Sequence, residues 1–316
     1  MPLTLALARE LTGAHARDAV LAITFSRDGA HCVTCGRDRA FALWSARTGT
    51  LLRAYRGGHG REVRDASCAR DGGTIATCGG DRGVYVWDVA TGAARRRFEG
   101  HDGDGGTNAV TFCANDCVVV SAGYDASVRV WDVRANGGRA MQILNARTGV
   151  GFEDSVTSLT RDEAWPRIAC GCVDGATRVV DIRRGELHVD AYGVPVTSVS
   201  FSRDNKCLAV GCLTSRVCLA ECATGDGLNT YRGHVAERAK TQCALTSDDA
   251  HVVSGSEDGR VVFWDVVTAE IVAEIDAHDP SSVVCGVDVS PPGVPPALAT
   301  CATDGRARLW TITSDR

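Results

Sequence analysis

Histidine, aspartate and a hydroxyl side chain recur together in this sequence at similar spacing, and they are the residue types best suited to chemistry. In hydrolases an Asp orients a His, and the His activates a hydroxyl as a nucleophile. Here each set also has a Trp six residues after the Asp. The four clearest sets are His59, Thr77, Asp81 and Trp87; His101, Ser121, Asp125 and Trp131; His234, Ser254, Asp258 and Trp264; and His278, Thr300, Asp304 and Trp310.

Repetition argues against a catalytic role for these sets, because an active site is built once. A fifth set continues the series with His15, Thr34, Asp38 and Trp44. A buried hydrogen-bonded network that ends on an indole N–H would instead tie each unit together. We therefore predict structural tetrads and assign no catalytic residue. On this interpretation, the Asp258→Ala variant leaves buried donors unpaired and lowers thermal stability.

The fifteen cysteines raise the question of metal binding or disulfides. Their number is odd, so a complete disulfide framework is impossible. Cys32 and Cys35 form a C-x-x-C pair, and Cys170 and Cys172 form a C-x-C pair. Zinc needs four converging ligands, whereas residues three apart on a strand point to opposite faces. We expect the cysteines to act as small buried hydrophobic residues, and we expect no metal and no cofactor.

Five tryptophans mark an internal repeat. The segments TCGGDRGVYVWDVATG and SGSEDGRVVFWDVVTAE align on Trp87 and Trp264, and two weaker copies carry Val180 and Ala220 at the aligned position. The seven aligned positions lie 40–49 residues apart. Gly-His dipeptides precede several units and Trp-Asp dipeptides end them. This pattern resembles the WD repeat, in which each unit forms one four-stranded blade of a β-propeller.

The repeat predicts an all-β fold, a seven-bladed WD-repeat β-propeller, with residues 1–316 in a single domain. Leu3, Leu5 and Leu7 alternate with smaller residues, which is strand periodicity. Since this segment precedes the first unit, we expect it to join the last blade and close the ring, which protects the sheet edges. The expected blades span 14–56, 57–99, 100–144, 145–191, 192–232, 233–276, and 277–313 together with 3–12.

The fourth and fifth units depart from the pattern. Unit four keeps Asp174 but lacks the His and the Trp. Unit five has Thr214 in place of the Asp and Val210 in place of the Ser or Thr. Two interpretations remain open. These blades have drifted because their neighbours hold them, or their surface has been remodelled for a partner.

Composition limits the classes of partner. The chain has 34 Lys plus Arg and 39 Asp plus Glu, a formal charge of −5, and a pI near 5.9. A general electrostatic nucleic-acid binder needs a basic stripe, and a membrane-spanning helix needs about 20 apolar residues. We expect no sequence-specific nucleic-acid binding and no membrane. The N-terminus has no secretory pattern, and free cysteines suit a reducing compartment, so we expect the nucleus and cytoplasm.

Loops at the ends of a propeller usually carry its function. The residue before each repeated Asp is expected in a turn at one face of the ring, together with the residues that precede the inner strands. A Trp side chain in a turn is also a residue type that often anchors a protein–protein contact. Segments 102–107, 135–154 and 235–240 are longer than the repeat requires. The candidate protein-binding residues are Arg37, Glu62, Asn108, Tyr124, Asp154, Trp165 and Glu257.

Three stretches point to one subfamily. They are RTGTLLRAYRGGHGREVRDAS (47–67), VDGATRVVDIRRGELHVDAYGVPVTSVSFSRD (173–204) and YRGHVAERAKTQCALTSDDAHVVSGSEDGRVVFWDV (231–266). They resemble the mitogen-activated protein kinase organizer, a seven-bladed WD-repeat scaffold also found among spliceosomal proteins. The resemblance covers nearly the full length. It implies docking of other proteins and no catalysis.

These observations predict a non-enzymatic protein–protein interaction scaffold that works as a monomer within a larger assembly. The first expectation is a component of the spliceosome or another mRNA-processing particle, with splicing factors as partners. The alternative is a scaffold for a MAP kinase cascade, with cascade components as partners. A propeller that binds a small molecule or acts as an enzyme is a third hypothesis, and the sequence offers no distinct site for it.

Overall fold

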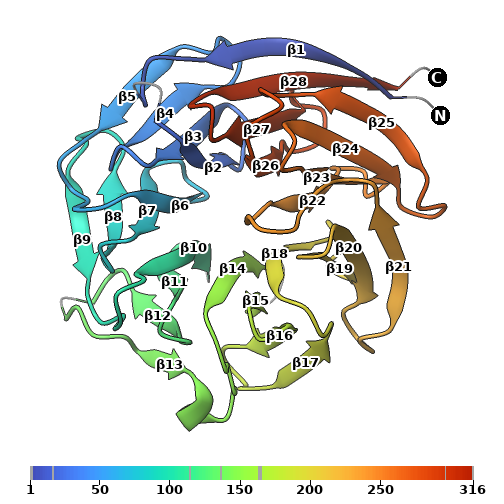
Figure 1. Cartoon of the computed structure of the whole chain (residues 1–316). Coiled ribbons are helices and arrows are strands. Elements are labelled where there is room, and N and C mark those ends of the chain that lie inside the picture. The colour runs from blue at the N-terminus through green and yellow to red at the C-terminus, as the bar shows by residue number, and fades with distance from the viewer. Residues whose placement is uncertain are drawn as a thin grey trace.

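The structure is a computed structural model that describes residues 3–15, 18–113, 115–135, 137–162, 166–295 and 297–314. Its strands form seven four-stranded antiparallel sheets, which stand as blades around a common centre (Figure 1). Within the described ranges the one helix is the short 3-10 turn η1 (Ala146–Thr148), and no helix there is long and apolar enough to cross a membrane. The expected all-β, seven-bladed propeller is confirmed.

The blades follow one another along the chain, and within blades one to six the strands pair in sequence order. Blade one contains β2 (Val20–Phe25), β3 (His31–Gly36), β4 (Phe41–Ser45) and β5 (Leu51–Tyr55). Blade two contains β6 (Val63–Cys68), β7 (Thr74–Gly79), β8 (Val84–Asp88) and β9 (Ala94–Phe98). Blade three contains β10 (Thr107–Cys113), β11 (Val118–Gly123), β12 (Val128–Asp132) and β13 (Gln142–Leu144). Blade four contains β14 (Val156–Arg161), β15 (Arg167–Cys172), β16 (Ala176–Asp181) and β17 (Leu187–Ala191).

The remaining blades repeat this order until the chain closes on itself. Blade five contains β18 (Val196–Phe201), β19 (Cys207–Cys212), β20 (Arg216–Glu221) and β21 (Gly227–Arg232). Blade six contains β22 (Cys243–Leu245), β23 (His251–Gly255), β24 (Arg260–Asp265) and β25 (Ile271–Asp276). Blade seven contains β26 (Val284–Val289), β27 (Leu298–Ala302), β28 (Ala307–Ser314) and, as its outer strand, β1 (Leu3–Leu11).

Burial along the strands explains the residue types that form them. The second strand of each blade lies between two neighbouring sheets, so β7 and β11 are small and apolar and almost entirely buried. The outer strands meet solvent, and β9 carries three successive arginines that are exposed or partly exposed. The third and fourth strands are joined by tight turns in which Gly49 and Gly92 have φ of 71° and 77°, a conformation that glycine adopts without strain.

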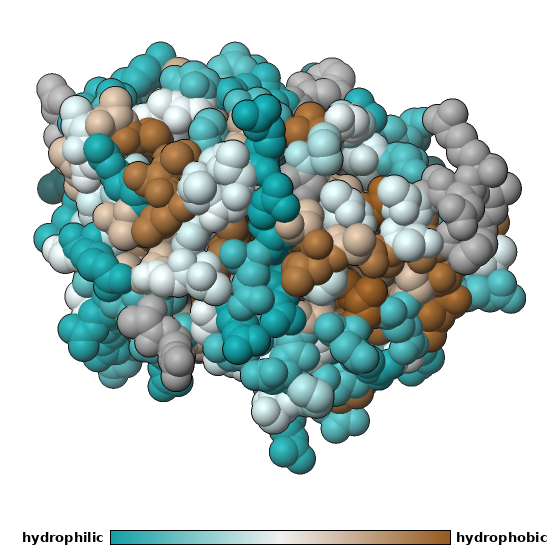
Figure 2. Space-filling view, turned by 90° about the horizontal axis from the view of Figure 1, so that it is seen from above, coloured by the Kyte–Doolittle hydropathy of each residue, from teal (hydrophilic) through white to brown (hydrophobic). Residues whose placement is uncertain are grey.

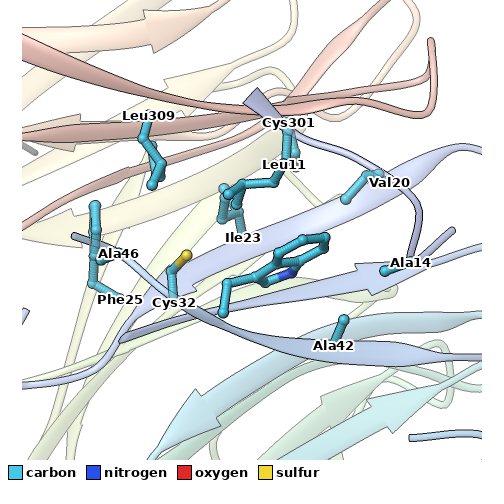
Figure 3. Close-up of a cluster of buried hydrophobic side chains, with 13 residues drawn as sticks. Leu11, Ala14, Val20, Ile23, Phe25, Cys32, Ala42, Ala46, Cys301 and Leu309 are labelled. Carbon is cyan, nitrogen blue, oxygen red and sulfur yellow. The ribbon is translucent and has the colours of Figure 1, made fainter. Parts of the chain in front are cut away.

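The ring is closed by strands from the two ends of the chain. β1 pairs antiparallel with β28, from Leu3 opposite Ser314 to Leu11 opposite Ala307, and the two strands run side by side at the rim (Figure 1). Leu11 is only 3% exposed and belongs to an apolar cluster that includes Ile23 and Leu309 (Figure 3). The N-terminal segment therefore completes blade seven and packs against blade one, as the strand periodicity predicted.

Among the described residues, side-chain hydrogen bonds link the inner-strand segments of neighbouring blades at six of the seven junctions, from blade two round to blade one. The first residue of each following pair is the donor: Val110 N to Asp65 Oδ2 (2.9 Å), Asn108 Nδ2 to Val156 O (3.0 Å), Thr157 Oγ1 to Val196 O (2.7 Å), Thr197 Oγ1 to Thr241 O (3.3 Å), Val287 N to Gln242 Oε1 (3.2 Å), and Phe25 N to Asp288 Oδ2 (2.7 Å). These strands line a central cavity of about 620 Å³. Burial beside this cavity raises the pKa of Asp65 and of Asp288 to about 6, even though the backbone N–H groups that donate to each carboxylate favour its charged form.

The outer rim is mixed in polarity. Seen from the side of β1, hydrophilic side chains separate the hydrophobic ones into several patches (Figure 2). The large hydrophobic side chains exposed on the outer strands β1, β5 and β25 are Leu7, Leu51, Leu52 and Ile271. Scattered exposed residues of this kind are normal on a protein surface, and they identify no site by themselves.

The closing strand offers a matched pair of substitutions. Leu11→Ala should lower the free energy of unfolding by about 2–5 kcal/mol, because it leaves a cavity between blades seven and one. Leu7→Ala on the same strand is the control, because Leu7 is 49% exposed, and its cost should stay within about 0.5 kcal/mol. Urea titration of both variants measures the difference. Equal, small losses would show that β1 does not hold the ring.

Candidate functional site at the Asp-turn end

The turns that carry the repeated Asp lie at one end of the propeller, here called the Asp-turn end. In blade three, Tyr124 N donates to Gly106 O (3.0 Å), the carbonyl that precedes the inner strand. The residue before the Asp, or its counterpart Leu213, makes the corresponding bond in five other blades. The pairs are Arg37 with Ala19, Gly80 with Glu62, Val173 with Ser155, Leu213 with Pro195, and Thr303 with Val283. Each turn residue is therefore fixed beside the segment that enters its own blade.

Four blades contain a complete hydrogen-bonded tetrad. In blade two, His59 Nδ1 lies 3.1 Å from Asp81 Oδ1, and His59 Nε2 lies 2.8 Å from Thr77 Oγ1. Trp87 Nε1 donates to the same hydroxyl at 2.8 Å. The same chain of contacts joins His15, Asp38, Thr34 and Trp44; His101, Asp125, Ser121 and Trp131; and His278, Asp304, Thr300 and Trp310. With Nδ1 protonated, every polar atom along this chain has a partner.

The tetrads position the turns rather than offering a nucleophile. The hydroxyls of Thr77 and Ser121 are fully buried, so no substrate reaches them in this arrangement. The carboxylate of Asp81 also accepts hydrogen bonds from the backbone N–H groups of Gly60 and Gly83 on either side of the turn. In blade three, burial raises the pKa of Asp125, but the hydrogen bond and charge of His101 outweigh it and lower the pKa to about 2.

Blade six does not form the predicted tetrad. Trp264 Nε1 donates to Arg232 O (2.8 Å), and Ser254 Oγ donates to Gly255 O (3.0 Å). His234 is 3% exposed, and its Nδ1 atom has no hydrogen-bond partner. Burial therefore lowers the pKa of His234 to about 4.

A neighbouring arginine explains why the tetrad of blade six is open. Arg260, two residues after Asp258, takes its carboxylate with Nε at 2.9 Å and Nη2 at 2.7 Å. This ion pair is partly exposed and does not connect to the histidine. The prediction that Asp258 holds buried donors was therefore wrong. In blade six the Arg, and not the His, binds the carboxylate, whereas Arg306 at the same position of blade seven pairs with Glu10 and leaves Asp304 to His278.

The partly exposed Glu257 carboxylate accepts hydrogen bonds within the protein, and its expected role in an interface stays a prediction. Its Oε1 atom accepts hydrogen bonds from the backbone N–H groups of Glu237, Arg238 and Ala239, at 2.7, 2.6 and 2.8 Å. Burial raises the pKa of this carboxyl, but the three donors outweigh it and lower the pKa below its usual value. Glu257 therefore anchors the enlarged segment 235–240, and this explains why that loop is ordered beside the turn.

Blade four replaces the missing histidine with an arginine. The Arg178 guanidinium lies over the Phe152 ring at 4.8 Å and reaches Asp174 at 2.8 Å, with both charged side chains 7% exposed. Phe152 stands where the other blades have their His, since Glu153 N donates to Asp174 just as Gly60 N donates to Asp81. The turn Asp thus keeps its role with a different cationic partner.

Three candidate binding residues converge on an arginine that the repeat pattern did not single out. Arg64 donates to Glu62 Oε1 (2.6 Å from Nη2) and to Asn108 Oδ1 (3.0 Å from Nη1), and its guanidinium lies 5.1 Å from the centre of the Tyr124 ring. Tyr124 is 50% exposed. Arg61 extends the surface by donating to the carbonyl of Asp104. We call Glu62, Arg64, Asn108 and Tyr124 the Arg64 cluster.

Comparison with known proteins supports the architecture. A family model described as WD domain, G-beta repeat matches residues 7–45, 49–88, 92–132, 225–265 and 269–311. The chain belongs to the WD-repeat family. The unmatched stretch 133–224 contains β13, all of blade four and the first three strands of blade five. Blades four and five still have four strands each, although they lack the tetrad.

WD-repeat proteins from mammals and from a yeast are similar to this chain over most of their length. WD repeat domain-containing protein 83 of Rattus norvegicus is 39% identical over 92% of this chain and 88% of its own length. The protein of the same name from Homo sapiens is 40% identical over the same shares. An uncharacterized WD repeat-containing protein of Schizosaccharomyces pombe is 31% identical over 83% of this chain and 89% of its own length.

The other candidate residues of this WD-repeat protein are not gathered into one site. Arg37 is exposed in the turn of blade one. Asp154 is exposed and accepts a hydrogen bond from Ser155 N (2.6 Å). Trp165 lies outside the described residues. Within the described part of the chain, no group of three or more His, Cys, Asp or Glu residues is arranged to hold a metal ion.

Two Asp→Ala variants separate a closed tetrad from an open one. Asp125→Ala should lower the free energy of unfolding by about 1–3 kcal/mol, because it leaves Nδ1 of the buried His101 without its hydrogen-bond partner. Asp258→Ala should cost less than about 1 kcal/mol, because its pair with Arg260 is partly exposed. Thermal and urea unfolding followed by circular dichroism measures both. Equal losses would mean that the closed network adds nothing.

His234 should make stability depend on pH. Its ordinary pKa of 6.5 is lowered to about 4 in the folded protein, so the unfolded chain binds more protons between these values. Stability conferred by neutral His234 is therefore lost as pH falls from about 6.5 towards 4, by at most about 3 kcal/mol. Urea titrations of the wild type and His234→Gln at pH 7, 5.5 and 4.5 should show the wild type losing more stability. Parallel curves would contradict the assignment.

Proposed function

We propose that this WD-repeat protein is a non-enzymatic scaffold that docks a partner protein at the Arg64 cluster. The observation that carries the proposal is the half-exposed Tyr124 ring, with an arginine guanidinium over it, on a turn fixed by a closed tetrad. Aromatic and arginine side chains on a rigid support are the residues that contribute most at protein interfaces. A preordered ring loses little conformational entropy when a partner covers it.

The proposed client is a MAP kinase cascade. Its support is the resemblance of residues 47–67, 173–204 and 231–266 to the mitogen-activated protein kinase organizer. The expectation of a spliceosome-associated role came first from the sequence, but the comparisons give it no support. Splicing factors are therefore kept as an outcome of the experiment and not as the proposal.

The experiment compares the wild type with two surface variants in native affinity purification. Tyr124→Ala removes the exposed ring of the Arg64 cluster. Val267→Ala is the control, because Val267 is 84% exposed in the turn between β24 and β25, at the opposite end of the propeller. Both variants are first checked for wild-type unfolding curves. Extracts from nucleus and cytoplasm, with and without ribonuclease, are analysed by mass spectrometry.

We expect kinase-cascade components to copurify with the wild type and with Val267→Ala. Tyr124→Ala should reduce their recovery about tenfold, which corresponds to about 1.4 kcal/mol of binding free energy. Undiminished recovery would overturn the docking site. Splicing proteins that survive ribonuclease, in place of kinases, would overturn the choice of client and restore the first expectation.

A further inference from the structure

Blade five contains a pair of thiols close to the Asp-turn end. Cys212 ends β19 and Cys218 lies in β20, where Cys212 is opposite Arg216 and Cys218 is opposite Val210. The two cysteines are thus diagonal neighbours on the same face of the sheet. Both side chains therefore point to the same side of the sheet, where they are neighbours on adjacent strands. Cys212 is buried, whereas Cys218 is partly exposed to solvent.

Donors and positive charge surround this pair. Arg216 Nη2 donates to Tyr192 O (2.6 Å), but its Nε atom is buried without a hydrogen-bond partner. Arg216 is directly opposite Cys212 and two residues before Cys218, so its side chain is on the same face of the sheet as both thiols. On the other side, Thr230 is directly opposite Cys218, and Arg232 is opposite Arg216. An anionic sulfur would satisfy these donors. A neutral thiol leaves the buried guanidinium N–H without an acceptor.

The other cysteines lie in different surroundings. All fifteen are free, and four of them are partly exposed: Cys117, Cys207, Cys218 and Cys285. Burial raises the pKa of Cys207 above its ordinary value and raises that of Cys285 to about 11. The neighbouring Cys212 thiol and the charges of Arg216 and Arg232 act in the opposite sense on Cys218 and lower its pKa below the ordinary value. Solvent access and thiolate character therefore coincide at Cys218.

We propose that Cys218 is a modification site for hydroperoxides, with Cys212 as its resolving thiol. The Cys218 thiolate attacks one oxygen of hydrogen peroxide, the O–O bond breaks, and Cys218 sulfenic acid and hydroxide form. The Cys212 thiol then attacks the sulfenic sulfur, an S–S bond forms, and water leaves with the Cys212 proton. The two sulfur atoms together lose two electrons, which the peroxide gains.

Oxidation at this position would alter the irregular part of the ring. The disulfide removes the anionic partner of Arg216, which also holds the carbonyl of Tyr192 in the connection from blade four to blade five. The redox-active thiol pair thus lies in a blade that lacks the tetrad. The proposal does not depend on the Arg64 cluster or on any partner protein, so it can fail while the proposed function stands.

The first test is alkylation of the reduced full-length protein with iodoacetamide, read by peptide mass spectrometry. At pH 7, Cys218 should react at least about tenfold faster than the control Cys207, and its rate should fall about tenfold in Arg216→Gln. Cys207 is likewise partly exposed but has no such cluster of donors. Equal rates for Cys218 and Cys207 would overturn the assignment of Cys218 as the reactive thiol.

The second test adds hydrogen peroxide to the reduced protein. The wild type should form a Cys212–Cys218 disulfide, with a mass loss of about 2 Da. Cys212→Ser should instead accumulate sulfenic acid at Cys218 that dimedone traps, and Cys218→Ser should give neither product. Wild-type unfolding curves confirm that both variants fold. Preferential oxidation of another cysteine, or a wild type that never forms the disulfide, would overturn the proposal.

Discussion

Each blade of this protein is a four-stranded sheet with two apolar faces, and only a closed ring buries both faces of every blade. Closure therefore governs the whole molecule. It is achieved by the pairing of β1 with β28 and by inner-strand side chains that bind the backbone of the next blade. Asp288 bridges blade seven to blade one at the same junction where Leu11 packs. The Phe25–Asp288 hydrogen bond between inner strands and the apolar packing of Leu11 thus both hold blade seven against blade one.

The Asp turns depend on that closed scaffold and in turn present the docking surface. In every blade except blade five, a carboxylate in the turn accepts hydrogen bonds from backbone N–H groups. Where this carboxylate is buried, it needs a positive or hydrogen-bonding partner. His59 supplies this partner in blade two, Arg178 supplies it in blade four, and Arg260 captures it in blade six. In blades two and four the residue before the Asp keeps its hydrogen bond to the segment that precedes the inner strand, whereas in blade six Glu257 N donates to Val235 O instead. The repeat sequence can therefore vary in blade four without changing this bond.

The two irregular blades have different explanations. In blade four, Phe152 and Arg178 replace the missing histidine and keep the bonds to the turn, which favours compensated drift. In blade five the Asp itself is absent, and Thr214 occupies its place with φ of 81°. The polar chain is replaced there by thiols beside Arg216. Blade five is therefore the place where loss of the repeat introduced chemistry that the regular blades do not have.

Much of this architecture could be read from the sequence. The spacing of the seven aligned positions, five of them Trp, predicted the number of blades. The alternation at Leu3, Leu5 and Leu7 predicted the closing strand. These features are local or periodic, so they are visible in one dimension. The repeat also identified the residues of the closed tetrads, because His, Asp, hydroxyl and Trp recur in a fixed order.

What the sequence left undetermined depends on contacts between segments far apart in the chain. The open tetrad of blade six follows from competition between Arg260 and His234 for one carboxylate, and residue spacing does not reveal which one wins. The sequence likewise does not reveal that three backbone N–H groups of residues 237–239 donate to the partly exposed Glu257 carboxylate. Arg64 joins Asn108 across two blades, 44 residues away. Composition and periodicity therefore determined the ring and its strands, and only the tertiary structure decided which charged groups are satisfied inside it and which remain exposed for a partner, because that depends on the distances between side chains of neighbouring blades.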